Sequence, residues 1–249
     1  MAKSMVSAPP ATKSFRAKHN ALYASERDCT RYDASLCRRQ DHAGNVLAAI
    51  RELLPLTPSL RVVDIGTGTG KLARLLAPHV HSVSAFDRSD EMVAAARAAT
   101  SASNVTYGAA DVRRVPLPDG CAGLVVAGWA ISYLKAEHEV WYRDGSSGGP
   151  WREEVDAALA EMQRLLAPGG VAVILETHGT ACEAPQRSGS WLYAHFRERG
   201  FRESCAAPRP NSAHAHAVCL YVLTSVPLAA RASTGSCAPT ISSRAAPRR

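Results

Sequence analysis

The sequence predicts an open α/β sheet of seven strands, doubly wound, with helices on both faces and the last strand antiparallel to its neighbours. Short β-branched apolar runs alternate with segments of helical periodicity along most of the chain, which is the pattern of a parallel sheet covered by helices. Several of these runs are apolar almost throughout, as in strands buried on both faces. No helical segment separates the last two strands, and a connection of about ten residues is short for a parallel crossover.

Two sets of segments make up this fold. Strands are expected at Leu60–Ile65, Val83–Phe86, Val105–Gly108, Ala122–Ala127, Val171–Glu176, Phe201–Ala206 and Ala217–Thr224. Helices are expected at Thr69–Leu76, Ser89–Ala99, Trp151–Leu166 and Trp191–Arg199, and through most of residues 14–54. Ser89 is the expected N-cap of its helix, because acidic residues follow it in the first turn. The helix from Trp151 is expected to end before Pro168-Gly169-Gly170, since proline and glycine often follow a helix C-terminus.

The positive charge of the chain is concentrated at its two ends. The net charge is +7, but residues 1–25 and 226–249 hold eight of the 29 Lys and Arg residues and no acidic residue. The remaining basic residues balance the 22 acidic residues to within one charge. A nucleic-acid surface needs its cations on the folded body, so no nucleic-acid partner is expected.

Composition divides the chain into three parts. Residues 1–13 and 226–249 are predicted to be a disordered extension and a disordered basic tail, and residues 14–225 to be one domain with an N-terminal helical cap. The seven cysteines are scattered and form no CxxC pair, which favours a reduced, cytoplasmic location. The acid-free N-terminus also allows a mitochondrial or plastid transit peptide. No apolar run is long enough to cross a bilayer.

The strongest local signal is the segment VVDIGTGTGK at residues 62–71, where a strand leads through three alternating glycines into a helix. Three interpretations compete for it. A phosphate-binding loop would need glycine in place of Ile65 and Ser or Thr in place of Leu72. A dinucleotide fingerprint would need its third glycine where Lys71 stands. The pattern GxGxG fits the loop that binds the sulfonium nucleoside S-adenosylmethionine, which carries no pyrophosphate.

An acidic residue stands at the expected distance from this loop. Asp87 directly follows the second predicted strand, 21 residues after Gly66, where an acid binds ribose hydroxyls in nucleotide-binding sheets of this type. A turn carboxylate or a tight glycine turn would each be unremarkable alone. Their combination on these elements favours a nucleoside pocket.

The chain resembles the class I S-adenosylmethionine-dependent methyltransferases, with a type 11 methyltransferase domain similar to the ubiquinone and menaquinone pathway enzymes. The resemblance spans about residues 33–224 and rests on VVDIGTGTG, FDRSDEM, GAAD at residues 108–111 and LLAPGG at residues 165–170. It implies a Rossmann-like sheet, S-adenosylmethionine as cofactor and methyl transfer to a small molecule.

The resemblance also implies which residues contact the cofactor. Asp64 and the loop residues would hold the methionine part, Asp87 the ribose, Asp111 and Val112 the adenine edge. Arg88 and Met92 would lie beside the adenine, and Gly128 and Trp129 next to the sulfonium. The full set implied to bind the cofactor is Asp64, Gly66, Thr67, Gly68, Gly70, Asp87, Arg88, Met92, Asp111, Val112, Gly128 and Trp129.

Methyl transfer from a sulfonium is a direct displacement that depends mainly on orientation and desolvation. An oxygen or carbon acceptor also benefits from a base, and the candidates are His178, His42 and Tyr133. The predicted function is transfer to O, N or C of a small-molecule acceptor, and no metal site is expected. A non-catalytic binding protein of this fold and a nicotinamide-dinucleotide oxidoreductase remain alternatives. The acceptor and the oligomeric state are left open.

Overall fold

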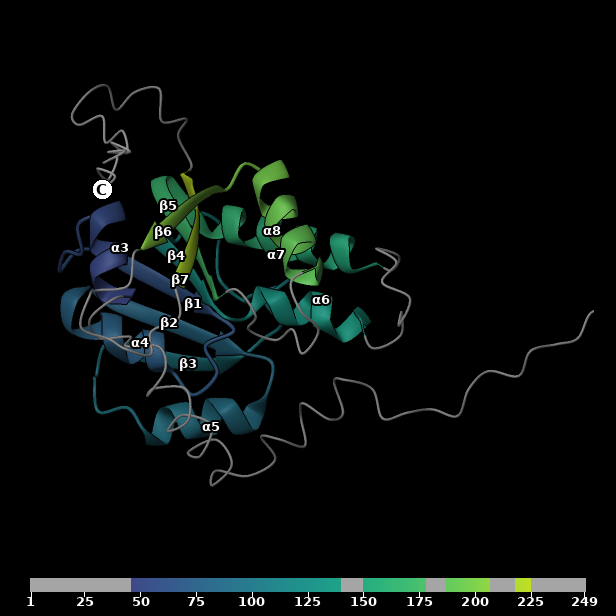
Figure 1. Ribbon diagram of the computed structural model, residues 1–249. Helices are drawn as coiled ribbons and strands as arrows, with labels where there is room; N and C mark the ends of the chain where they lie inside the picture. Colours follow the sequence, from purple (N-terminus) through teal and green to yellow (C-terminus); the bar gives the residue numbers. More distant parts are fainter. Residues whose placement is uncertain (1–45, 140–149, 178–186, 207–217, 225–249) are drawn as a thin grey trace, which may run out of the picture.

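The computed structural model describes residues 46–139, 150–177, 187–206 and 218–224 (Figure 1). These residues form one seven-stranded sheet in the order β3-β2-β1-β4-β5-β7-β6. The strands are β1 (Arg61–Ile65), β2 (Ser82–Asp87), β3 (Val105–Ala109), β4 (Ala122–Gly128), β5 (Leu166–Thr177), β6 (Arg202–Ala206) and β7 (Val218–Thr224). Strands β3, β2, β1, β4 and β5 pair in parallel, and β7 is antiparallel to both β5 and β6. This confirms the predicted seven strands and the antiparallel last strand.

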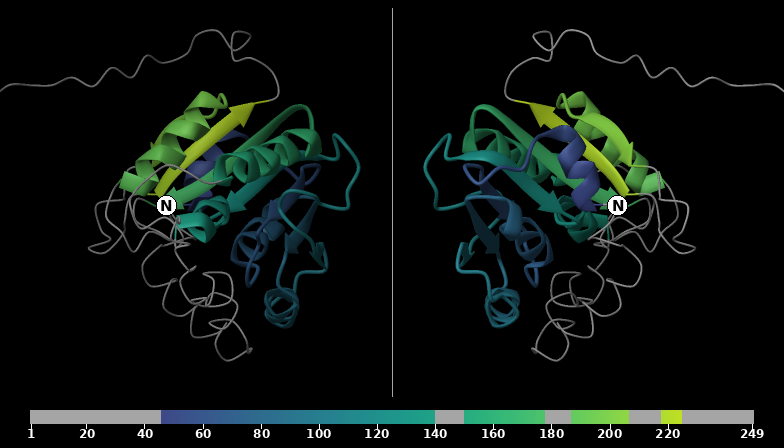
Figure 2. Two further views of the ribbon diagram at one scale, coloured as in Figure 1. Left: turned by 90° about the vertical axis from the view of Figure 1, so that its right-hand side faces the viewer. Right: turned by 90° about the vertical axis from the view of Figure 1, so that its left-hand side faces the viewer.

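Helices cover both faces of the sheet (Figures 1 and 2). They are α3 (Leu47–Leu53), α4 (Lys71–Leu76), the short 3-10 helix η2 (Ala77–His79), α5 (Asp90–Ala98), α6 (Ile131–Glu139), α7 (Trp151–Leu165) and α8 (Arg187–Glu198). Helix α5 packs against β2 and β3. Among the described segments, no helix is both long enough and apolar enough to cross a membrane.

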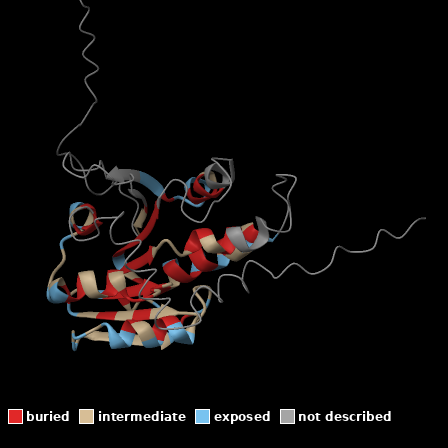
Figure 3. Ribbon diagram, turned by 60° about the horizontal axis from the view of Figure 1, so that its bottom comes forward, coloured by how far each residue is buried: buried red, intermediate tan, exposed pale blue. Residues whose placement is uncertain are grey.

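Two apolar cores lie on either side of the central strands. Successive residues of β1 alternate between them: Val62 packs with α3 and α4, and Val63 packs with α6, α7 and α8. This alternation explains why the strand is apolar on both faces. Figure 3 shows the buried residues concentrated in the central strands and in the helix surfaces turned toward them.

The order of strands reverses at β1, which has β2 on one side and β4 on the other. In open α/β sheets, ligands bind outside the carboxyl ends of the strands at such a switch point. The glycine-rich segment follows β1 at this edge, so the fold places it where a ligand site is expected.

The predicted N-cap of α5 is confirmed. The Oγ of Ser89 accepts a hydrogen bond from the backbone N–H of Met92 at 3.2 Å, and Asp90 and Glu91 occupy the first turn. Side-chain capping satisfies one of the free N–H groups at a helix start, and acidic residues there interact favourably with the helix dipole.

Strand β5 begins earlier than the sequence pattern predicts. The helix ends at Leu165, and Leu166 already pairs with Ala122 of β4. The register then shifts between Ala122 and Leu124, and Gly169 adopts a positive φ of 78°. The proline and glycines therefore form an irregularity inside the strand, as glycine in a strand often does, and not a separate turn before it.

Helix α6 (Ile131–Glu139) was missed by the sequence pattern, which leaves residues 135–150 as a loop. Its first turn receives support from a distant residue, because the backbone N–H of Ser132 donates to Glu176 Oε1 at 3.0 Å. A cap supplied by another strand leaves no local signal in the sequence. The predictions for residues 1–45 and 225–249, including the extension, most of the helical cap and the basic tail, lie outside the described residues.

The connection between β3 and β4 is held to α7 through Arg164. Its guanidinium donates to both carboxylate oxygens of Glu161 at 2.7 and 2.6 Å, to Asp119 Oδ1 at 2.6 Å, and to the carbonyls of Leu117 and Val115. The backbone N–H of Val115 in turn donates to Glu161 Oε1 at 2.7 Å. The pKa of Glu161 lies below its usual value, mainly because of the hydrogen bonds from Arg164.

Replacing Arg164 with methionine is expected to lower the free energy of unfolding by about 3 kcal/mol, because it leaves the buried Glu161 carboxylate without its cation. Urea denaturation measures the loss. The matched control is Arg197→Met, which breaks an exposed ion pair with Glu203 and is expected to cost about 1 kcal/mol or less. Equal losses in the two variants would show that the hydrogen bonds and ion pairs of Arg164 stabilise the fold no more than a surface ion pair does.

Candidate nucleoside-binding site

A glycine loop connects β1 to α4 at the switch point. Gly66, Gly68 and Gly70 have φ values of 70°, 55° and 80°, a region that residues with a Cβ atom rarely adopt. The loop closes on itself through a hydrogen bond from the Gly70 N–H to the Thr67 carbonyl at 2.9 Å. The sequence GTGTG therefore folds into a turn whose backbone is open to a ligand on one side.

The acid at the end of β2 is bonded directly to this loop. The N–H of Gly68 donates to Asp87 Oδ2 at 2.8 Å, and the N–H of Ser89 donates to Asp87 Oδ1 at 3.0 Å. The N–H of Thr67 also donates to the Phe86 carbonyl at 2.9 Å. The structure thus brings together the two features that the sequence placed 19 residues apart.

Gly68 faces empty space and Gly66 does not. A Cβ atom added at Gly68 would meet no atom of the described residues within 4 Å, whereas one added at Gly66 would lie 2.3 Å from Ala130 Cβ and 3.5 Å from Val112 Cγ1. A Cβ atom at Gly128 would likewise lie 2.4 Å from Leu72 Cδ1. The room for a ligand at this loop is therefore at Gly68, beside Asp87.

Asp64 lies under the loop at the end of β1 and is completely buried. Its Oδ2 accepts a hydrogen bond from Thr67 Oγ1 at 2.6 Å, and its Oδ1 makes no hydrogen bond within the described residues. Burial raises the pKa of Asp64 to about 7, and the negative charge of Asp87 adds to this while the Thr67 hydrogen bond opposes it. A buried carboxylate oxygen without a partner is costly, and a cationic group of a ligand would stabilise its charged form.

The pKa values of the two remaining carboxyl groups of the site are shifted in opposite directions. Burial raises the pKa of Asp87, against the opposing hydrogen bonds from the Ser89 and Gly68 N–H groups. Asp111 lies in the opposite situation, because the hydrogen bonds from Arg113 hold its pKa below the usual value. Arg113 Nε lies 2.7 Å from Asp111 Oδ1, and a further guanidinium nitrogen lies 2.6 Å from Glu154 Oε2. Arg113 therefore belongs to an ion-pair network that joins Asp111 to α7.

The other residues implied to contact a cofactor lie along the same edge of the sheet. Arg88 directly follows Asp87 and is half-buried, and Met92 is buried in the first turns of α5. Trp129 follows β4 with a positive φ of 52°, and its backbone N–H donates to the Leu175 carbonyl at 2.8 Å. A tryptophan in this backbone region is strained, and such strain concentrates at functional sites.

One of the three candidate bases is described by the structure. Tyr133 is half-buried in the first turn of α6, and its N–H approaches the Ala130 carbonyl at 3.3 Å. His42 and His178 lie outside the described residues. A further carboxyl group, Glu176, is completely buried at the same edge of the sheet. Sequence analysis treated Glu176 only as the end of an apolar strand, although a carboxylate closing the run VAVILE is itself an unusual residue at a buried position.

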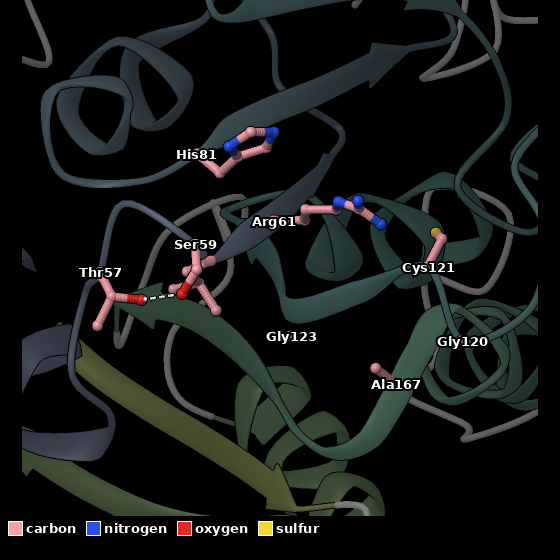
Figure 4. A pocket seen from close by; sticks show the side chains of 9 residues that line it. Thr57, Ser59, Arg61, His81, Gly120, Cys121, Gly123 and Ala167 are labelled. Atoms are coloured by element: carbon pink, nitrogen blue, oxygen red, sulfur yellow. Dashed lines mark hydrogen bonds between the residues drawn. The ribbon is translucent and has the colours of Figure 1, made fainter.

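A separate hollow of about 470 Å³ lies at the opposite edge of the sheet (Figure 4). It is lined by Thr57, Ser59, Leu60, Arg61, His81, Gly120, Cys121, Gly123 and Ala167. Arg61 begins β1 and Cys121 precedes β4, so this hollow is at the amino ends of the strands and is not part of the glycine-loop site.

The strand order and the glycine loop bonded to Asp87 define a doubly wound sheet with a candidate ligand site at its switch point. Comparison with known proteins finds methyltransferases. Residues 63–174 match a family model described as a methyltransferase domain. This part of the chain is therefore similar to methyltransferases, as the sequence resemblance indicated.

Three similar proteins illustrate the relationship. A malonyl-[acyl-carrier protein] O-methyltransferase of Pectobacterium atrosepticum is 30% identical over 48% of this chain and 39% of its own length. A ubiquinone/menaquinone biosynthesis C-methyltransferase of a Caulobacter species is 26% identical over 55% of this chain and 51% of its own length. The chain thus spans about half the length, or less, of these curated relatives. The crystal structure of a SAM-dependent methyltransferase from Aquifex aeolicus shares the fold, with a TM-score of 0.56, 16% identity, and coverage of 81% of this chain and 99% of that one.

Proposed function

We propose that this protein transfers the methyl group of S-adenosylmethionine to an O, N or C atom of a small-molecule acceptor. The observation that carries the proposal is the hydrogen bond from Gly68 to Asp87, beside open space at Gly68. It joins the loop after β1 to the acid after β2 in one site, and residues 63–174 match a methyltransferase domain.

Each side chain of the site has a proposed part in holding the cofactor. Asp87 would accept hydrogen bonds from the ribose hydroxyls, because its carboxylate lies at the end of β2 next to the open position. The unpartnered Oδ1 of Asp64 and the loop would hold the methionine part, whose amino group is cationic. The remaining proposed contacts are those of Gly66, Thr67, Gly70, Arg88, Met92, Asp111, Val112, Gly128 and Trp129, as the resemblance implies.

The cofactor supplies an electrophilic methyl group when it is bound. The protein would contribute orientation and exclusion of water, which are the main requirements of a direct displacement. The residues of α6 and the end of β5 lie beyond β4, on the side of the site away from Asp87, and this is where an acceptor would be placed. Tyr133 is the candidate base within the described residues, and His42 and His178 remain candidates outside them.

The range of acceptor atoms stays open in this proposal. The relatives are named for O-methylation of malonyl-[acyl-carrier protein] and for C-methylation in quinone biosynthesis, so similarity alone does not choose the atom. A cytoplasmic location is part of the proposal, supported by the scattered cysteines, of which Cys121 is a free thiol in the structure.

Calorimetric titration of the protein with S-adenosylmethionine, and separately with NADH, tests the cofactor. We expect saturable binding of S-adenosylmethionine and no binding of NADH. Methyl transfer is then measured with labelled S-adenosylmethionine and a metabolite extract, where label is expected in a small-molecule fraction. Binding of NADH without S-adenosylmethionine would favour an oxidoreductase, and S-adenosylmethionine binding without transfer to any acceptor would favour a non-catalytic protein.

Replacing Gly68 with alanine is expected to weaken S-adenosylmethionine binding at least about tenfold, because the new methyl group would project into the space proposed for the ligand. The matched control is Gly169→Ala in β5. Gly169 also has a positive φ and free space around its Cβ position, so both variants should lose about 1–2 kcal/mol of stability. Only Gly68→Ala should bind the cofactor more weakly in calorimetry, and unchanged binding would mean that the space at Gly68 is not used.

A further inference from the structure

Glu176 is a completely buried carboxylic acid near the end of β5. Its Oε1 accepts the backbone N–H of Ser132 at 3.0 Å, which caps the first turn of α6. Within the described parts of the chain, its Oε2 makes no hydrogen bond of normal geometry. The buried hydroxyl of Ser132 also makes none, although it lies near enough to the Glu176 carboxyl to lower its pKa. One helix cap thus accounts for only half of the hydrogen-bonding capacity of this carboxyl group.

Capping alone does not explain an ionisable group at this position. A glutamine would accept the same N–H through its amide oxygen without burying a group that can become charged. A buried carboxyl is disfavoured by desolvation, and unsatisfied polar atoms in a native protein are uncommon enough to require a reason. A buried carboxyl and a buried hydroxyl that lie beside each other without a well-formed hydrogen bond indicate a place where a polar ligand group is received.

The position of Glu176 in the sheet matches the acceptor side of the proposed reaction. Gly128 of β4 pairs with Leu175 of β5, and the N–H of Trp129 donates to the Leu175 carbonyl. Glu176 is therefore one residue beyond the point at which strained Trp129 meets β5. The glycine loop follows β1 on the other side of β4, so the loop and Glu176 flank the carboxyl end of β4.

We infer that Glu176 accepts the proton of the methyl acceptor, and that the hydroxyl of Ser132 helps to bind the same acceptor group. This inference rests on the proposed function and deepens it. The acceptor is then a compound with a weakly acidic O–H or C–H group, such as a phenol or an enol. Its proton passes to Glu176 Oε2, and its electron pair forms the bond to the methyl carbon. Bound S-adenosylmethionine would supply the methyl group: its carbon–sulfur bond would break with the electron pair on sulfur, and the carboxylate of Glu176 would become neutral as the sulfonium charge is lost.

The electrostatics of the site support this role. Burial raises the pKa of Glu176 to about 8, while hydrogen bonding from Ser132 opposes the rise. A base whose pKa is near the working pH is well matched to proton transfer. Among residues whose side chains are described, the other titratable groups on the elements packed against Glu176 are Tyr133 and Lys135 on α6 and Tyr221 on β7. Cys219 of β7 is its register partner.

The raised pKa makes a separate prediction about stability. A carboxyl whose pKa is higher in the folded state than in the unfolded state destabilises the fold as pH rises from the unfolded value, about 4.5, to the folded value. Glu176→Gln should therefore match the wild type in Tm at pH 5 and exceed it by at least about 5 °C at pH 8. This measurement needs no acceptor and shows whether the variant folds.

The decisive experiment compares wild type, Glu176→Gln, Ser132→Ala and the exposed control Glu203→Gln. Binding of S-adenosylmethionine is measured by calorimetry, and kcat is measured at saturating S-adenosylmethionine from pH 6 to 9 on the labelled acceptor fraction. Glu176→Gln is expected to bind the cofactor within about twofold of wild type, but to lose at least about thirtyfold in kcat. The rise of kcat with pH up to about 8 should disappear in this variant alone, and Ser132→Ala should mainly raise the KM for the acceptor.

The possible results separate the inference from the proposed function. If the wild type does not bind S-adenosylmethionine, the proposed function fails and the inference fails with it. If the wild type binds the cofactor and Glu176→Gln keeps its kcat and pH profile, or if no acceptor is methylated, Glu176 is only a helix cap and the inference is overturned.

Discussion

Replacing Asp87 with alanine is expected to abolish detectable binding of S-adenosylmethionine. The substitution removes the carboxylate that would hold the ribose, and it also removes the acceptor for the N–H groups of Gly68 and Ser89. Hydrogen bonds to a charged group contribute about 1.5–3 kcal/mol each, and each 1.4 kcal/mol changes a dissociation constant about tenfold. Loss of two ribose contacts and of the loop geometry corresponds to a rise in Kd of about a thousandfold.

The control for this variant is Asp90→Ala, which removes the same charge from the exposed first turn of α5. Asp90→Ala should bind S-adenosylmethionine within about threefold of the wild type, because long-range charge effects are largely screened at physiological salt. Asp87→Asn keeps an oxygen for the Gly68 N–H, so its affinity for S-adenosylmethionine should lie between those of Asp87→Ala and Asp90→Ala. Thermal unfolding of all three variants confirms that they fold, and tight binding by Asp87→Ala would remove the basis for assigning this edge of the sheet to the cofactor.

Local patterns were sufficient to predict most of the fold and to single out the glycine loop and Asp87, which the structure brings together. The strands of the parallel sheet are apolar runs of the right length, and Ser89 caps α5 with a side chain next to its own helix. The glycine loop and Asp87 were predicted for the same reason, since each carries its signal within a few residues of a strand end. Their hydrogen bond follows from the register of β1 and β2, in which Ile65 pairs with Phe86.

The parts that escaped prediction depend on contacts between distant segments. Helix α6 starts where Glu176, 44 residues away, accepts the N–H of Ser132. Arg113 bridges Asp111 to Glu154, 41 residues further along, so the pair Arg113-Arg114 could not be distinguished from a solvated basic pair by composition. The irregular start of β5 could not be predicted, because a proline followed by two glycines is equally typical of a turn after a helix.

The affinity for S-adenosylmethionine is expected to fall about a hundredfold between pH 7 and pH 5. The proposed partner of the cationic methionine part is the ionised form of Asp64, and burial raises the pKa of this carboxyl to about 7 in the free protein. Below that pH the ligand must displace a proton, which raises Kd about tenfold for each pH unit. Asp87, whose pKa is also raised by burial, adds to the same trend.

Calorimetry from pH 5 to 7.5, in pairs of buffers with different ionisation enthalpies, measures both the affinity and the number of protons released on binding. About one proton per ligand, or slightly more, is expected at pH 6. Asp64→Asn provides the control, because its amide keeps an oxygen for Thr67 but does not titrate, so its weaker affinity should change much less with pH. The same variant should be more stable than the wild type at pH 7.5, since a carboxyl with a raised pKa destabilises the fold above its unfolded value of 3.8. A wild-type affinity that is constant across this range would show that Asp64 is not ionised by the ligand and that the methionine part is held elsewhere.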